Sequence, residues 1–249
     1  MSDLPHLIPE NSSANPPHQT HDFSPSCPFC MISTTYGPIS PISAPIHASL
    51  DSRKLDPPAF VLFSSEHVIA FLDIMPLTRG HVLVAPRKHR VKVGSLSADE
   101  SAEIGRVLPM LARSVIKAVM PDIPHEEADY NVVQNNGPGA AQVVPHVHFH
   151  IVPRPPLNYV PPPSTSSNTR KYPPNAQPPA PLRTTILFGR GMRDDLDYED
   201  AAVLVEDMRE AVREEWMGRI STEVDVRDGE ESVAPGTNGG GKRKGAWKV

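Results

Sequence analysis

The sequence predicts an α+β fold, with a group of short strands, one long amphipathic helix and a second helix near the C-terminus. Apolar runs of four or five residues bounded by turn residues give the strand signal. One stretch whose apolar side chains recur at helical spacing gives the long helix. Segments dense in proline and poor in apolar residues cannot build a core, so they are predicted to be disordered.

Three strands are predicted before the long helix. Residues 60–63 and 68–72 are apolar runs, and a turn at 64–67 joins them. A further turn leads into a strand at 81–85, which Pro86 is expected to end.

The long helix is predicted to begin after Ser97 and to end before Pro121. Ser97 is a favoured N-cap residue, and Glu100 stands at the spacing of a capping box. The apolar residues that follow form one face of this helix. They are Ile104, Val107, Leu108, Leu111, Val115, Ile116 and Val119.

Two more strands and a helix are predicted in the second half of the chain. Residues 130–134 form a strand that leads into a turn at 135–139. Residues 146–152 form the last strong strand, which Pro153 is expected to end. Apolar residues on one face predict a C-terminal helix from 198 to about 216.

The predicted organisation is a single ordered domain flanked by loose segments. The 30 prolines crowd the first sixty residues and the stretch from Pro153 to Pro181, where little apolar surface is available to bury. In chain order we predict a disordered tail (1–23), an ordered domain (24–154), a proline-rich insertion or linker (155–182), a C-terminal helical extension (183–218) and a second disordered tail (219–249).

Composition narrows the function classes. A formal net charge of −5 and a pI near 6.1 argue against the basic face that stable nucleic-acid binding needs. The chain has no apolar run of membrane-spanning length, and its N-terminus lacks the features of a secretory signal. We therefore expect a cytoplasmic protein that binds no membrane. The basic run 242–244 leaves a nuclear location as an alternative.

The chain has two cysteines, Cys27 and Cys30, in a C-x-x-C pair. In a secreted protein such a pair would suggest a disulfide. In the reducing setting expected here, the spacing favours metal binding or redox chemistry.

Three histidines stand at alternate positions of the last predicted strand. Because side chains alternate between the faces of a strand, His146, His148 and His150 are expected to point to one side. Val147 and Phe149 then point to the other side, into a core. A polar surface strand and a metal site formed by the three imidazoles are the alternatives.

Two segments together resemble the hallmarks of the histidine triad family. Residues 135–154 read NNGPGAAQVVPHVHFHIVPR, and residues 72–86 read LDIMPLTRGHVLVAP. The resemblance covers about residues 27–154, and two separate motifs in the right order make it specific. It implies the histidine triad fold, in which an antiparallel sheet carries a long helix.

The resemblance implies a nucleotide hydrolase with His148 as the catalytic nucleophile. A neutral imidazole is a good nitrogen nucleophile near pH 7, and a covalent intermediate divides one difficult displacement into two easier ones. His148 would attack the α-phosphorus of a nucleoside phosphoramidate or a dinucleoside polyphosphate. Water would then hydrolyse the nucleotidyl-histidine and release a nucleoside monophosphate. A purine nucleotide of the adenosine type is favoured, and no organic cofactor is required.

The resemblance also implies substrate-binding residues. His81 and His150 would contact phosphate oxygens. Asn135 and Gln142 would add neutral donors to the phosphate. Asp73 would accept hydrogen bonds from the ribose hydroxyls. Taken alone, Asp73 and Asn135 are also ordinary turn residues.

The cysteine pair matches the zinc-bearing branch of the family. In that branch the remaining ligands correspond to His89 and His146, which completes a Cys₂His₂ set with Cys27 and Cys30. Four protein ligands suit a structural zinc rather than one that activates water. Two free thiols with a surface His89 are the alternative.

Several functional questions stay open at this level. Val143 stands where the family often has a hydroxyl residue, so the leaving group is undetermined.

A nucleotidyl transferase is an alternative function, although His150 stands where transferases of the galactose-phosphate type usually carry glutamine. A DNA-end deadenylase is disfavoured, because it would be expected to have a C-terminal zinc finger and a basic face, and the sequence shows neither. A non-enzymatic nucleotide-binding scaffold protein is the alternative from another class. Homodimers are common in the family. Arg190 and Arg193 are interpreted as a solvated approach to the C-terminal helix, with a position near the phosphate as the alternative.

Overall fold

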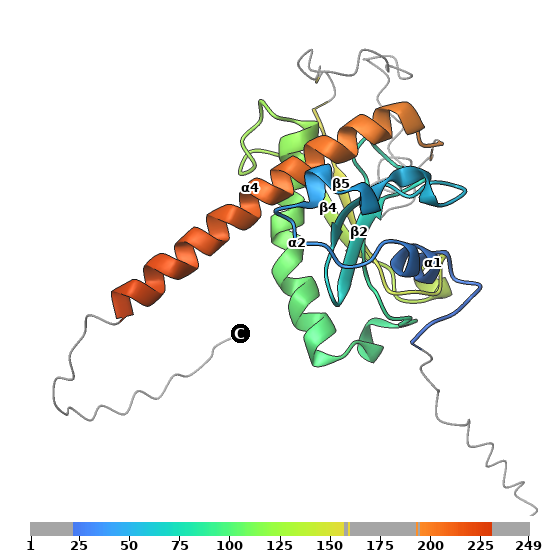
Figure 1. Ribbon diagram of the computed structural model, residues 1–249. Coiled ribbons are helices and arrows are strands. Elements are labelled where there is room, and N and C mark those ends of the chain that lie inside the picture. Colours follow the sequence, from blue (N-terminus) through green and yellow to red (C-terminus); the bar gives the residue numbers. More distant parts are fainter. Residues whose placement is uncertain (1–21, 157–158, 160–192, 194, 231–249) are drawn as a thin grey trace, which may run out of the picture.

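The structure is a computed structural model that describes residues 22–156, 159, 193 and 195–230, with side chains described as far as Arg219 (Figure 1). The predictions for most of the N-terminal tail, most of the proline-rich insertion, Arg190 and the basic run 242–244 lie outside these residues. The elements are α1 (Pro28–Thr35), η1 (Ala44–Ile46), η2 (Ala48–Leu50), η3 (Ser52–Lys54), β1 (Val61–Ser64), β2 (Val68–Leu72), β3 (Val82–Pro86), η4 (Val93–Ser95), α2 (Ala98–Val119), β4 (Tyr130–Gln134), η5 (Pro138–Ala140), β5 (Phe149–Pro153) and α4 (Tyr198–Glu230).

The strands form one antiparallel sheet in the order β1-β2-β3-β5-β4. This arrangement confirms the predicted α+β class. The early strand β3 lies beside the late strand β5, with Leu83 opposite His150 and Val82 opposite Ile151. Because residues that face each other across two strands share one side of the sheet, His150 lies on the same side as Leu83.

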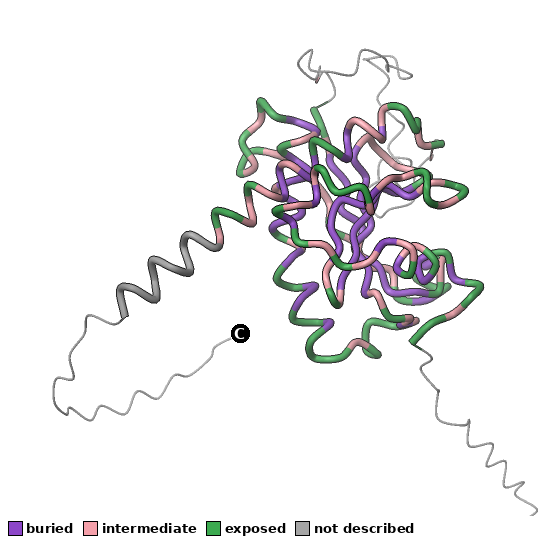
Figure 2. The backbone as a smooth tube through the Cα atoms, viewed as in Figure 1, coloured by how far each residue is buried: buried purple, intermediate pink, exposed green. Residues whose placement is uncertain are grey.

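The sheet separates two apolar cores. One contains side chains of α2 and α4 together with Leu62, Val84 and Ile151 from the strands. The other contains α1 and the segment after it, with Leu83 and Phe71 from the strands. Figure 2 shows β1, β2 and β3 buried along their length, whereas the edge strand β4 is intermediate to exposed. Strands covered on both sides need apolar residues at successive positions, which explains their unbroken apolar runs.

Helix α2 confirms the long helix and its cap. It runs from Ala98 to Val119, and Ser97 and Glu100 form both bonds of the capping box. Its apolar face is buried against the sheet and α4. Among the described residues no helix is long and apolar enough to cross a membrane.

Both predicted ends of the triad strand and the predicted end of β3 were wrong. Strand β5 begins at Phe149, not at His146. The reason is local, because the amide of Val147 donates to the carbonyl of Arg90 and the carbonyl of His146 accepts from side chains. Pro86, like Pro153, is the last residue of its strand rather than the residue that stops it, a position where proline is tolerated.

The C-terminal helix is longer than predicted. α4 continues to Glu230, whereas the sequence prediction ends it near residue 216 and begins a tail at 219. The residues beyond Trp216 are mainly charged and polar. An apolar pattern therefore gives no signal there, although many of these residue types are compatible with helix.

Candidate active site and Cys₂His₂ cluster

His148 has the tautomer that a nitrogen nucleophile needs. Its Nδ1 lies 2.6 Å from the carbonyl oxygen of His146, and because a carbonyl only accepts, Nδ1 must carry the hydrogen. In the neutral ring, Nε2 therefore holds a lone pair. The side chain is 5 % exposed, and burial lowers the pKa of His148, so the ring is neutral near pH 7.

His81 and His150 form a directed pair beside His148. The main-chain N–H of Leu77 donates to Nδ1 of His81 at 3.1 Å, so the hydrogen of neutral His81 is on Nε2. That Nε2 donates to Nδ1 of His150 at 2.9 Å. The hydrogen of neutral His150 is then on its own Nε2, where it can be donated to a ligand. The ring centroids of His148 and His150 lie 4.8 Å apart.

Burial keeps this pair neutral. It lowers the pKa of His81 to about 3, with a further contribution from Arg193. It lowers the pKa of His150 to about 3 as well, with a contribution from His81. A site made of neutral imidazoles offers hydrogen-bond donors and lone pairs without a fixed positive charge on the rings.

Asp73 follows β2 and lies against His81. Its carboxylate is 7 % exposed. Oδ1 accepts the N–H of Met75 at 2.9 Å, and Oδ2 lies 3.5 Å from Nδ1 of His81. Oδ2 also accepts from Nη1 of Arg193 at 2.8 Å. The sequence interpretation of Arg193 as a solvated residue was therefore wrong, because its guanidinium reaches the predicted ribose-binding carboxylate.

Gln142 supports the carbonyl that orients His148. Its Nε2 donates to the carbonyl oxygens of His146 and Val91, at 3.1 Å in each case. These contacts occupy the amide hydrogens that the sequence prediction reserved for phosphate. Asn135 lies half-buried in the turn after β4. Its main-chain carbonyl oxygen accepts a hydrogen bond from Nε2 of Gln134 at 2.9 Å.

The two cysteines converge with His89 and His146 as the sequence resemblance implies. The four ligand atoms lie within 4.8 Å of one another. Nδ1 of His146 is 3.4 Å from Sγ of Cys27, and Nδ1 of His89 is 3.3 Å from Sγ of Cys30. Ligands held at about 2.0–2.3 Å around a tetrahedral metal are about 3.3–3.8 Å apart, so the set fits a zinc-sized ion.

Outer contacts also suit a metal centre. Nε2 of His146 donates to the carbonyl oxygen of Pro86 at 2.9 Å, which directs the lone pair of Nδ1 toward the cysteines. Burial raises the pKa of the Cys30 thiol to about 11, so a thiolate at this position needs a nearby cation. The cluster lies at the start of α1, and Phe29 of that helix packs edge-on against both His146 and His148.

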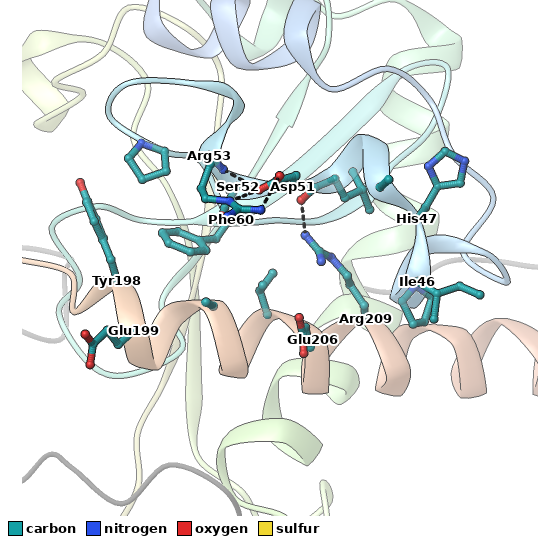
Figure 3. A pocket seen from close by; sticks show the side chains of 16 residues that line it. Ile46, His47, Asp51, Ser52, Arg53, Phe60, Tyr198, Glu199, Glu206 and Arg209 are labelled. Carbon is teal, nitrogen blue, oxygen red and sulfur yellow. Dashed lines mark hydrogen bonds and ion pairs between the residues drawn. The ribbon is translucent and has the colours of Figure 1, made fainter.

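A pocket lies apart from these residues. It has a volume of about 700 Å³ and lies between the segment around η1 to η3 and the first turns of α4 (Figure 3). Arg209 in its wall donates to the carbonyl oxygens of Val61 and Leu50. These bonds tie α4 to β1 and η2, which is a structural role, and the lining includes no triad histidine.

Comparison with known proteins identifies the family. The HIT domain family matches residues 54–157. The adenosine 5'-monophosphoramidase hnt1 of Schizosaccharomyces pombe is 44% identical over 106 residues, which is 43% of this chain and 72% of that protein. The chain belongs to the histidine triad family.

Further histidine triad proteins agree with this assignment. The adenosine 5'-monophosphoramidase HNT1 of Saccharomyces cerevisiae is 35% identical over 131 residues, covering 50% of this chain and 75% of that protein. A crystal structure of a hypothetical histidine triad nucleotide-binding protein from Sulfolobus tokodaii aligns with a TM-score of 0.51 and 22% identity, over 76% of this chain and 93% of that one. The latter likeness supports the fold.

The structure adds site features that the sequence could not indicate. Three imidazole tautomers are set by main-chain groups, namely the carbonyls of His146 and Pro86 and the N–H of Leu77. Every residue type carries the carbonyl and every type but proline the N–H, so the sequence gives no signal. Arg193 lies 120 residues from Asp73 in the chain. Its charge was the one available signal, and nothing in the local pattern indicated a partner.

Proposed function

We propose that this histidine triad protein is a nucleotide hydrolase that attacks the α-phosphorus of a nucleoside phosphoramidate through Nε2 of His148. The hydrogen bond from Nδ1 of His148 to the carbonyl of His146 carries this proposal. It presents the opposite ring nitrogen as a lone pair. It also stabilises the positive charge that the ring acquires when Nε2 binds phosphorus.

The proposed reaction has two displacements. In the first, Nε2 of His148 forms a bond to phosphorus, the phosphorus–nitrogen bond to the leaving group breaks, and the released amine takes up a proton from solvent. In the second, water attacks the same phosphorus, the bond to His148 breaks, and the water gives up a proton. The net result is a nucleoside monophosphate, a free amine and a regenerated neutral His148.

The neighbouring residues would bind the nucleotide. Nε2–H of His150 is available to a phosphate oxygen, because His81 holds the other nitrogen of that ring. Asp73 would accept ribose hydroxyls at the end of β2. Gln142 would act through the carbonyl that orients His148 rather than through phosphate. The sequence-based role of Asn135 as a phosphate donor remains a prediction.

The names of the relatives support the substrate class that we propose. Two fungal relatives are named adenosine 5'-monophosphoramidases, so we favour an adenosine phosphoramidate over a dinucleoside polyphosphate. Val143 is 89 % exposed. An apolar residue there offers no hydroxyl to the leaving group, so we expect recognition to rest on the nucleotide half of the substrate.

The Cys₂His₂ cluster is proposed to hold one structural zinc. Cys27, Cys30, His89 and His146 would be the ligands, and the ion would tie α1 to the start of the triad segment. No water-activating role is proposed, because four protein ligands close the coordination shell.

The function is tested with a fluorogenic adenosine phosphoramidate. We expect turnover by the wild type and a loss of at least about a thousandfold in His148→Ala, since the covalent route is removed. His125→Ala is the matched control, because His125 is a partly exposed histidine whose recorded partner is Glu126. Mass spectrometry of the quenched reaction should find a nucleotidyl adduct on His148.

Two outcomes favour the alternatives. Wild-type protein that binds AMP but turns over no nucleotide substrate would indicate a nucleotide-binding scaffold protein. An adduct that is discharged to a phosphate or sugar phosphate much faster than to water would indicate a transferase.

A further inference from the structure

The C-terminal extension reaches the proposed nucleotide site through one side chain. Nη1 of Arg193 donates to Oδ2 of Asp73 at 2.8 Å and to the carbonyl oxygen of Met75 at 2.7 Å. Asp73 comes from the end of β2, whereas Arg193 precedes α4 by a few residues. Neither hydrogen bond belongs to the triad strand or to the turn before it.

Several contacts hold this part of the extension in place. The N–H of Leu196 donates to the carbonyl oxygen of Ile74 at 3.0 Å. Arg79 forms a bidentate ion pair with Asp200 in the first turn of α4. Its Nε lies 2.8 Å from Oδ2 and its Nη2 lies 2.9 Å from Oδ1. The loop that follows Asp73 is thus bonded to Leu196 and to the first turn of α4, which lie a few residues beyond Arg193 in the chain.

Arg193 also forms an ion pair with the buried Asp73 carboxylate. His81 lies 3.5 Å from Oδ2, and a ring nitrogen of His150 lies within 4.8 Å of the same carboxylate. The facing nitrogen of His81 already accepts from the N–H of Leu77, so it presents a lone pair and cannot donate to the carboxylate. Without Arg193, Oδ2 would face a lone pair in a buried site, which is unfavourable for a carboxylate.

We infer that Arg193 is a positioning residue of the ribose subsite: it holds the Asp73 carboxylate in the orientation that accepts ribose hydroxyls. A carboxylate has about four acceptor positions. Met75 and Arg193 use one on each oxygen, which leaves acceptor positions for the two hydroxyls of a ribose. This inference rests on the proposed function, and it places part of nucleotide recognition in the extension.

The inference predicts a change in sugar recognition rather than in chemistry. A hydrogen bond to a charged group is stronger than one between neutral groups, and Arg193 is partly exposed, so we expect Arg193→Ala to raise KM for the adenosine phosphoramidate by about tenfold. kcat should change by no more than about twofold, since His148 is not touched. The preference for the ribose substrate over its 2'-deoxy counterpart should shrink by a similar factor.

Two variants separate positioning from a general structural effect. Arg193→Lys keeps a charged donor and should recover part of the sugar preference. Arg213→Ala is the matched control, because Arg213 lies on α4 and pairs with Glu210 of the same helix; it should retain the wild-type KM and preference. A KM and sugar preference that Arg193→Ala leaves unchanged, or a lower KM, would overturn the inference.

Failure of the proposed function can be recognised separately. If the wild type turns over neither substrate, the hydrolase proposal fails, and the positioning role is then measured by calorimetric binding of AMP and 2'-deoxy-AMP. Weaker AMP binding and a smaller sugar preference in Arg193→Ala would support the role. Equal values in both proteins would reject it.

Discussion

Gly80→Ala is expected to destabilise the fold strongly, because Gly80 is the point where the loop after β2 meets two helices. Gly80 has a φ of +81°, which costs a residue with a Cβ about 1–2 kcal/mol. An added Cβ would lie 2.3 Å from Cγ2 of Val119 and 3.3 Å from Cε of Met208. The methionine can move, but a valine in a helix has one strongly preferred rotamer, so its methyl group cannot turn away cheaply.

The two effects add to a predicted loss of about 2–5 kcal/mol, since overpacking a core typically costs about 1–3 kcal/mol. Urea unfolding followed by circular dichroism measures it. Gly105→Ala is the matched control, because nothing lies within 4 Å of a Cβ at this exposed site in α2. It should stabilise the protein by about 0.5–1 kcal/mol. A Gly80→Ala protein within about 0.5 kcal/mol of the wild type would refute the reasoning.

Three other predictions concern the site. Gln142→Ala removes two buried hydrogen bonds and should cost about 2 kcal/mol in unfolding free energy, with a fall in kcat/KM of less than about tenfold; a fall of a thousandfold at unchanged stability would instead support a direct phosphate contact. Burial lowers the pKa of His81 and His150 to about 3 from 6.5, so below pH 6.5 the unfolded chain binds protons that the folded protein does not. This contribution to stability should be fully present above pH 6.5 and fall toward pH 5 by about 2 kcal/mol for each histidine, or about 4 kcal/mol for the two together; denaturant curves that coincide at pH 7 and pH 5 would contradict this. Cys27→Ser should reduce zinc content from about one ion per chain to well below it, as measured by inductively coupled plasma mass spectrometry; unchanged zinc would show that the ion binds elsewhere.

The sequence predicted those features that depend on pattern. Apolar runs located β2, β3 and α2 to within a residue, and Ser97 with Glu100 fixed the start of α2. The resemblance of two motifs predicted that His81 and His150 serve the same phosphate, and in the structure the two rings are joined by a hydrogen bond. Such features can be predicted because their residue types and spacing are themselves the physical cause.

Other features depend on contacts that no local pattern encodes. The strand pattern placed His146 in β5, but the main chain there bonds to Arg90 and Gln142 instead of to a neighbouring strand. Arg193 meets Asp73 because α4 docks on the loop after β2. That docking results from packing over the whole domain, and it cannot be derived from the residues around Arg193.

His146 contributes to both candidate sites, with its side chain at the Cys₂His₂ cluster and its main-chain carbonyl beside His148. Its imidazole faces the cysteines, while its carbonyl orients His148. Every amino acid carries that carbonyl, so its contribution to the orientation of His148 is independent of the His146 side chain. A relative could therefore exchange His146 and both cysteines and still keep His148 correctly oriented, provided the main chain followed the same path. The candidate metal cluster is in this sense separable from the proposed nucleophile, whereas the backbone path beside it is not.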